Sequence, residues 1–179
     1  NIQIILKVIG FLLIVESIGM LLCLFASSYY SLDYKSLLYS GLITAGVGSL
    51  LFLLFYNTPR KIAKRESFII VSVIWIILAA FGSLPFLLSG YFPNYTHAFF
   101  EALSGFTTTG STVLTNVEIV PKDILLWRSL MQWIGGIAVI VFALAIIPIL
   151  GMGNLQMYAS EIYGPTNDKI NPRVIEITK

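Results

Sequence analysis

The sequence predicts an all-α membrane protein, and three observations carry that prediction. Of the 179 residues, 57% are hydrophobic and only 11% are charged, whereas a soluble domain carries roughly 25% charged residues. Four apolar segments approach or exceed the length of about 20 residues that crosses a bilayer. Charges are rare inside these segments. The composition excludes a disordered chain and argues against a soluble globule, because so much apolar surface would have no interior to occupy.

The predicted spans follow one another along the chain. They run from about Ile4 to Phe25, Leu37 to Tyr56, Phe68 to Gly90 and Ile124 to Leu150. The first two form a hairpin. Glu16 interrupts the first span and costs about 2.5–3.5 kcal/mol at a helix centre, which the apolar residues around it outweigh. We expect Glu16 to have a structural partner across the hairpin.

Orientation is predicted from Lys and Arg in the short connections. The connection at 57–67 is the most basic, with Arg60, Lys61, Lys64 and Arg65. The long connection at 91–123 carries Lys122 alone. Because Lys and Arg accumulate on the cytoplasmic side, we expect the 57–67 loop and both termini in the cytoplasm and the long connection outside.

The long outer connection is not a uniformly polar loop. Its apolar part predicts a short helix over residues 96–106, with Thr96 as the N-cap. At 1.5 Å per residue this helix rises only about 16 Å, too little to span a bilayer. It can enter the membrane, stop partway and return. The return would be residues 107–112, Thr-Thr-Thr-Gly-Ser-Thr, which we call the Thr–Gly segment.

The composition of the Thr–Gly segment suits a cation path. Extended backbone at membrane depth is tolerated only where protein buries it or where it lines a watery cavity. Small side chains let carbonyl groups crowd one axis, as in pores that replace the hydration shell of K⁺. The short helix would also aim about half a negative charge at the cavity. A surface turn after a helix lying on the membrane explains the same residues nearly as well.

Little in the sequence points to catalysis. Residues 105–112 nearly match the phosphate-binding pattern G-x-x-x-x-G-K-[ST], but Ser111 takes the lysine position. His97 is the only histidine, for which we expect a solvated or capping role, and Cys23 is the only cysteine. An enzyme would need a nucleophile with a base, or a metal cluster. We therefore expect no enzyme and no cofactor, and a net charge of +2 is too small to suggest nucleic-acid binding.

Two stretches carry a resemblance to a known family. Residues 100–114 read Phe-Glu-Ala-Leu-Ser-Gly-Phe-Thr-Thr-Thr-Gly-Ser-Thr-Val-Leu, and residues 127–136 read Trp-Arg-Ser-Leu-Met-Gln-Trp-Ile-Gly-Gly. With the tail from Gln156 to Arg173, they resemble the TrkH-type potassium transporters of the Trk/Ktr/HKT superfamily. The resemblance covers most of the chain and favours the cation path over the surface turn.

The resemblance implies a helical hairpin followed by one membrane-helix/re-entrant pore-helix/membrane-helix repeat of a potassium-channel-like pore. The hairpin and a cytoplasmic loop would occupy residues 1–66, and the first pore repeat residues 67–153. The repeat would contain a membrane helix at 68–90, a pore helix at 96–106, a filter at 107–112 and a membrane helix at 124–150. Residues 154–179 would be a cytoplasmic tail leading to a second repeat. Since the family uses four repeats in one chain, either this chain is a truncated or split product or several copies assemble around one axis, and we expect the former.

The resemblance also implies the residues of an ion site. K⁺ would bind the backbone carbonyls of Thr108 and Thr109, with Gly110 as the filter glycine. Thr107 and Ser111 would flank them.

Further residues of the repeat have two interpretations each. Glu101 is either a brace that accepts hydrogen bonds from backbone N–H groups behind the filter or a partly exposed carboxylate near the outer mouth. Arg128 either packs behind the filter or extends to the headgroups. Gly135 and Gly136 permit either a bend or close helix packing.

For a complete protein, the resemblance implies potassium uptake through a bacterial inner membrane. The partners it implies are the remaining pore repeats, a second copy in a homodimer, a cytosolic nucleotide-binding regulatory subunit and the lipid bilayer. The alternative is a non-catalytic membrane anchor or assembly subunit, with the Thr–Gly segment as a surface turn.

Overall fold

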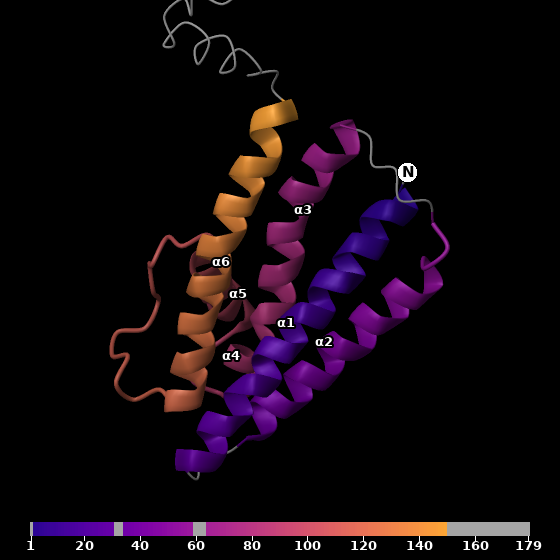
Figure 1. The fold of residues 1–179 in the computed structure, drawn as a ribbon. Coiled ribbons are helices and arrows are strands. Elements are labelled where there is room, and N and C mark those ends of the chain that lie inside the picture. Colours follow the sequence, from indigo (N-terminus) through magenta and orange to yellow (C-terminus); the bar gives the residue numbers. More distant parts are fainter. Residues whose placement is uncertain (1, 31–33, 59–63, 150–179) are drawn as a thin grey trace, which may run out of the picture. The chain divides into compact units, whose positions relative to one another are not determined.

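The computed structural model describes residues 2–30, 34–58 and 64–149. The described residues form helices and no strand, which confirms the predicted all-α class (Figure 1). The helices are α1 (Ile2–Tyr30), α2 (Lys35–Leu54), α3 (Lys64–Gly82), α4 (Leu84–Leu88), α5 (Tyr95–Phe106) and α6 (Lys122–Ile149). Residues 1–142 make one compact unit, within which all contacts below lie.

Three described helices are long and apolar enough to cross a membrane. They are α1, α2 and the Lys122–Val141 part of α6. The third predicted span, 68–90, differs from the prediction because it is not one continuous helix. Its residues belong to α3, which ends at Gly82, and to the short helix α4, which begins at Leu84.

The third predicted span is interrupted at Ser83, between α3 and α4. Pro85 lies in the first turn of α4 and has no N–H to donate to the preceding turn, so the helix breaks there. The indole N–H of Trp127 on α6 donates to the carbonyl oxygen of Gly82 at 2.9 Å. A side chain from a distant helix thus satisfies backbone at the break.

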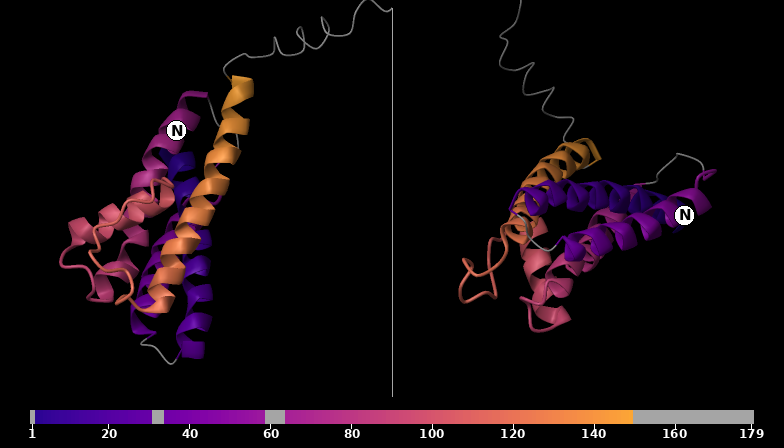
Figure 2. Two further views of the ribbon diagram at one scale, coloured as in Figure 1. Left: turned by 90° about the vertical axis from the view of Figure 1, so that its left-hand side faces the viewer. Right: turned by 90° about the horizontal axis from the view of Figure 1, so that it is seen from below.

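The hairpin of α1 and α2 is a close, antiparallel pair (Figures 1 and 2). Its helices meet at two glycines, where backbone packs on backbone. A methyl group on Gly10 would lie 2.7 Å from the amide nitrogen of Phe52 and 2.8 Å from the carbonyl oxygen of Gly48. Small residues allow this approach, which gives packing energy where lipid supplies no hydrophobic drive between helices.

The far end of α1 is fixed to the beginning of α6. The buried hydroxyl of Ser27 donates to Oδ2 of Asp123 at 2.7 Å. The ammonium group of Lys122 lies 4.4 Å from the centre of the Tyr30 ring. These contacts tie the hairpin to the second half of the described chain, which carries the Thr–Gly segment.

The orientation of the chain stays a prediction. Part of the basic 57–67 connection, residues 59–63, lies outside the described residues, and so does the whole predicted tail at 154–179.

The hairpin geometry predicts opposite effects for two glycine substitutions. Gly10→Ala should lower the free energy of unfolding by about 1–3 kcal/mol, because the new methyl group meets backbone atoms that cannot rotate away. Gly46→Ala on α2 is the control, since nothing lies within 4 Å of the added methyl group. It should raise stability by up to about 1 kcal/mol through helix propensity. Thermal unfolding in detergent measures both, and equal effects would contradict the close crossing.

Candidate functional site

The short helix α5 begins one residue before the predicted start. Asn94 has extended backbone, and its side-chain oxygen accepts the N–H of His97 at 3.0 Å. Nδ1 of His97 lies 2.6 Å from the same oxygen. The prediction of Thr96 as N-cap is therefore wrong, because Asn94 reaches the free N–H groups from outside the helix. The solvated or capping role expected of His97 is not that of the N-cap itself, since its ring only contacts the capping side chain of Asn94.

The end of α5 lies deep along α6. A methyl group on Gly135 would lie 2.1 Å from the carbonyl oxygen of Phe106, so the backbones of the two helices touch. This contact is about 20 Å along α6 from Lys122 at 1.5 Å per residue. Since a hydrocarbon core is about 30 Å thick, a membrane-spanning α6 would hold the end of α5 within that core.

Immediately after α5 the chain reverses. The N–H groups of Thr107, Thr108 and Thr109 still donate to carbonyl oxygens of the last turn of α5, at 2.9–3.0 Å. Thr108 has φ +56° and Gly110 has φ +75°, both left-handed. For threonine this conformation costs about 1–2 kcal/mol, so the surrounding contacts must hold it.

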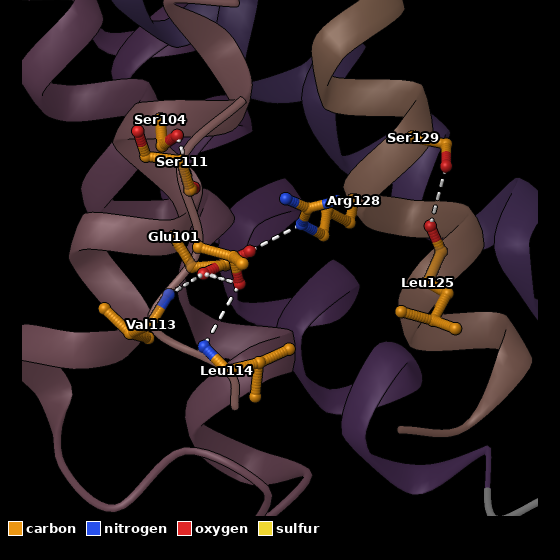
Figure 3. Close-up of polar contacts among 9 residues, drawn as sticks. Glu101, Ser104, Ser111, Val113, Leu114, Leu125, Arg128 and Ser129 are labelled. Carbon is orange, nitrogen blue, oxygen red and sulfur yellow. Dashed lines mark hydrogen bonds and ion pairs between the residues drawn. The ribbon is translucent and has the colours of Figure 1, made fainter. Parts of the chain in front are cut away.

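The chain then runs back beside α5, as Figure 3 shows. The Ser104 hydroxyl donates to the carbonyl oxygen of Ser111 at 2.6 Å. One turn further back on α5, Glu101 accepts the N–H of Val113 at 3.1 Å. Two side chains of the helix thus hold the returning backbone extended at its flank. Sequence reasoning missed Ser104, because a serine within a helix gives no local signal of a partner seven residues later.

The carbonyl oxygens of Thr107, Thr108, Thr109 and Gly110 accept no hydrogen bond from the described part of the chain, and all four residues are exposed. The nearby hydroxyls are occupied with each other and with the helix. Thr107 Oγ1 donates to the carbonyl oxygen of Leu103 at 2.8 Å and lies 2.8 Å from Thr109 Oγ1. Four consecutive carbonyl groups remain open to a ligand, whereas the carbonyl of Ser111 is already bound to α5.

Glu101 is the centre of the site's polar contacts (Figure 3). Its side chain is completely buried, and Oε2 accepts the Thr112 hydroxyl at 2.9 Å in addition to the Val113 amide. Oε1 accepts Nε of Arg128 on α6 at 2.5 Å. The interpretations of Glu101 as an exposed carboxylate and of Arg128 as a residue extended to the headgroups are therefore wrong. The two charges offset each other behind the returning backbone.

Glu16 lacks the predicted partner across the hairpin. Its side chain is buried on α1, and neither carboxyl oxygen has a hydrogen-bond partner in the described residues. Oε1 occupies space that the missing side chain of Gly82 leaves open, since a methyl group there would lie 2.8 Å away. The same methyl group would lie 2.7 Å from the ring of Phe106. Glu16 thus lies beside Gly82 of α3.

Comparisons with known proteins agree in pointing to one family. The family model TrkH, described as a cation transport protein, matches residues 35–179. The Trk system potassium uptake protein TrkH of Halomonas elongata is 36% identical over the whole chain, which spans 38% of that relative's length. TrkH of Escherichia coli K12 is 42% identical over 76% of the chain and 29% of the relative.

The fold has a match among solved structures. The crystal structure of the potassium transporter TrkH from Vibrio parahaemolyticus superposes with a TM-score of 0.80 at 30% identity. The match covers 99% of this chain and 35% of that structure. The chain therefore spans between 29% and 38% of the length of these relatives.

The contacts of Glu101 predict a strong effect of removing its charge. Glu101→Gln keeps the side-chain volume but replaces one carboxylate oxygen by an NH₂ group. In either orientation of the amide, this NH₂ group faces another donor, either the Arg128 guanidinium or the Thr112 hydroxyl and Val113 N–H. We expect a loss of about 2–4 kcal/mol in thermal unfolding, because a buried donor or charge loses its partner. Glu118→Gln, on the same connection but exposed, is the matched control and should be neutral. Equal stability of the two variants would contradict a bracing role.

The unpartnered carboxyl of Glu16 predicts that an apolar side chain is tolerated. Glu16→Leu has similar volume and should leave stability unchanged or higher, because no hydrogen bond is lost and a buried polar group is removed. Glu16→Ala should lose about 2–4 kcal/mol through the cavity that it leaves. Thermal unfolding of the two variants distinguishes them, and a marked loss for Glu16→Leu would reveal a partner.

Proposed function

Since the chain belongs to the TrkH family of cation transport proteins, we propose that it forms part of a path for K⁺ uptake across a membrane. The family and the three apolar helices make it an integral membrane protein. The relatives it matches are transport proteins rather than enzymes, in agreement with the absence of catalysis expected from the sequence. In this proposal the Thr–Gly segment replaces the hydration shell of the ion.

One observation carries the proposal: four successive carbonyl oxygens, from Thr107 to Gly110, lie unpaired at the end of a half-length helix. Carbonyl groups with no protein donor bind either water or a cation, and rings of such groups form the filters of K⁺ channels. Thr108 and Thr109 would supply the ligands, and Gly110 would supply the left-handed turn after them. Thr107 would flank them. Ser111 would form the wall of the site, because its carbonyl is bound to Ser104.

The electrostatics of the site favour a cation over an anion. The C-terminal end of α5 presents about half a negative charge to the Thr–Gly segment. Arg128, the positive group that lies behind this segment, is paired with Glu101. Pairing removes most of the repulsion that an isolated guanidinium would exert on K⁺. The same ion pair keeps the returning backbone extended, so support and charge balance come from one contact.

One Thr–Gly segment supplies only part of a carbonyl ring. We propose that residues 67–153 form the first of four pore repeats and that residues 1–66 form the peripheral hairpin. The remaining repeats, a second copy in a homodimer and a cytosolic nucleotide-binding subunit would be the partners. A bacterial inner membrane would be the location, with the basic 57–67 loop and both termini in the cytoplasm.

A pair of glycine substitutions tests the filter assignment. Gly110 and Gly90 have nearly the same left-handed backbone, φ +75° and +74°, and a methyl group meets nothing within 4 Å at either. Each alanine substitution therefore imposes a similar strain of about 1–2 kcal/mol. Gly110→Ala should abolish growth of a potassium-uptake-deficient strain at low K⁺, whereas Gly90→Ala should retain it.

The test uses the polypeptide as its gene encodes it, with membrane abundance measured for each variant. Normal growth with Gly110→Ala would refute the filter assignment. It would favour the alternative of a membrane anchor or assembly subunit.

A further inference from the structure

We propose that Gly135 on α6 is a positioning residue that sets the depth of the Thr–Gly segment and thereby its preference for K⁺ over other alkali cations. The inference rests on the proposed function and adds a residue that contacts no ion. It starts from the tightest glycine contact in the described structure. A methyl group on Gly135 would lie 2.1 Å from the carbonyl oxygen of Phe106, 2.8 Å from its carbonyl carbon and 3.1 Å from its Cα.

All three of these contacts are with backbone atoms. A side chain could rotate away from an added methyl group, but the carbonyl of Phe106 is part of the last turn of α5. Interiors packed this densely transmit a displacement instead of absorbing it. A substitution at Gly135 therefore has to move the end of α5 away from α6.

Any movement of Phe106 reaches the proposed ion ligands directly. Phe106 is followed at once by Thr107, and the N–H groups of Thr107, Thr108 and Thr109 are bonded to carbonyl oxygens of Leu103, Gly105 and Ser104. These hydrogen bonds join the three threonines to the last turn of α5. The carbonyl groups of Thr108 and Thr109 would shift with the helix end, while Glu101 and Ser104 hold the return backbone from the other side.

The neighbouring glycine separates this role from a helix bend. Gly136 has nothing within 4 Å of an added methyl group, so it makes no close approach. A hinge would need backbone freedom at the Gly135–Gly136 pair, whereas the positioning role needs the absence of a side chain at Gly135 alone. Met131, one turn before Gly135 on the same face, continues the contact because its Cβ lies 3.4 Å from a methyl group on Gly105.

The experiment compares Gly135→Ala with Gly136→Ala in the polypeptide as its gene encodes it. Uptake of K⁺, Rb⁺ and Na⁺ is measured in cells, with the amount of protein in the membrane. Gly135→Ala should raise the KM for K⁺ and reduce the preference for K⁺ over Na⁺ by about tenfold or more, because carbonyl geometry decides the match to the ion. Gly136→Ala should keep both values. A merely structural role would lower only the maximal rate, in proportion to the amount of protein.

A milder variant keeps the inference testable if Gly135→Ala does not accumulate. Met131→Ile adds a branch at Cβ, where α6 faces Gly105, and should shift KM and preference in the same direction by a smaller factor. Unchanged KM and preference in an inserted Gly135→Ala protein, or in Met131→Ile if it alone accumulates, overturns the inference. Equal shifts in Gly135→Ala and Gly136→Ala favour a bend and overturn it as well. If Gly110→Ala also leaves uptake unchanged, the proposed function itself has failed.

Discussion

The buried carboxylate of Glu101 is the contact on which the arrangement of the site depends. It joins the middle of α5, the returning backbone at Thr112 and Val113, and Arg128 on α6. A carboxylate with no exposure is stable only when its lone pairs are satisfied, and here three donors satisfy them. The partners come from two segments outside α5, so the charge can be buried only when α5 and both of these segments are in place. Local backbone conformation and long-range packing are thereby fixed together.

Small residues determine how deep each segment lies. Gly10 and Gly48 let α1 and α2 touch, Gly82 leaves space for Glu16 and the Phe106 ring, and Gly135 admits the end of α5 against α6. In a membrane, close packing of this kind stabilises helix association, because lipid provides no hydrophobic effect between helices such as stabilises a soluble core. The short length of α5 limits how far it extends, and the backbone contact between Phe106 and Gly135 sets the position of its end along α6.

Local patterns were enough to predict the helices, because apolar runs and turn residues act within a few positions. They predicted α1, α2, α6 and the short α5 to within a few residues at most ends. The interruption at Ser83 was missed, although Pro85 could have signalled it. The sequence left two interpretations open for Glu101 and for Arg128, and it gave no indication of the contact between Ser104 and Ser111. These contacts depend on which faces of separate helices meet, and local sequence patterns contain no information on this. For the same reason the sequence wrongly predicted a partner for Glu16 across the hairpin.

The bond between Ser27 and Asp123 has a consequence for how the protein is made. Ninety-six residues separate the two side chains, so the ribosome releases α1 long before the aspartate is synthesised. The hydroxyl donor on α1 is thus made before its acceptor on α6. The bond therefore joins the end of α1 to the start of α6 through two residues that are synthesised at well-separated times.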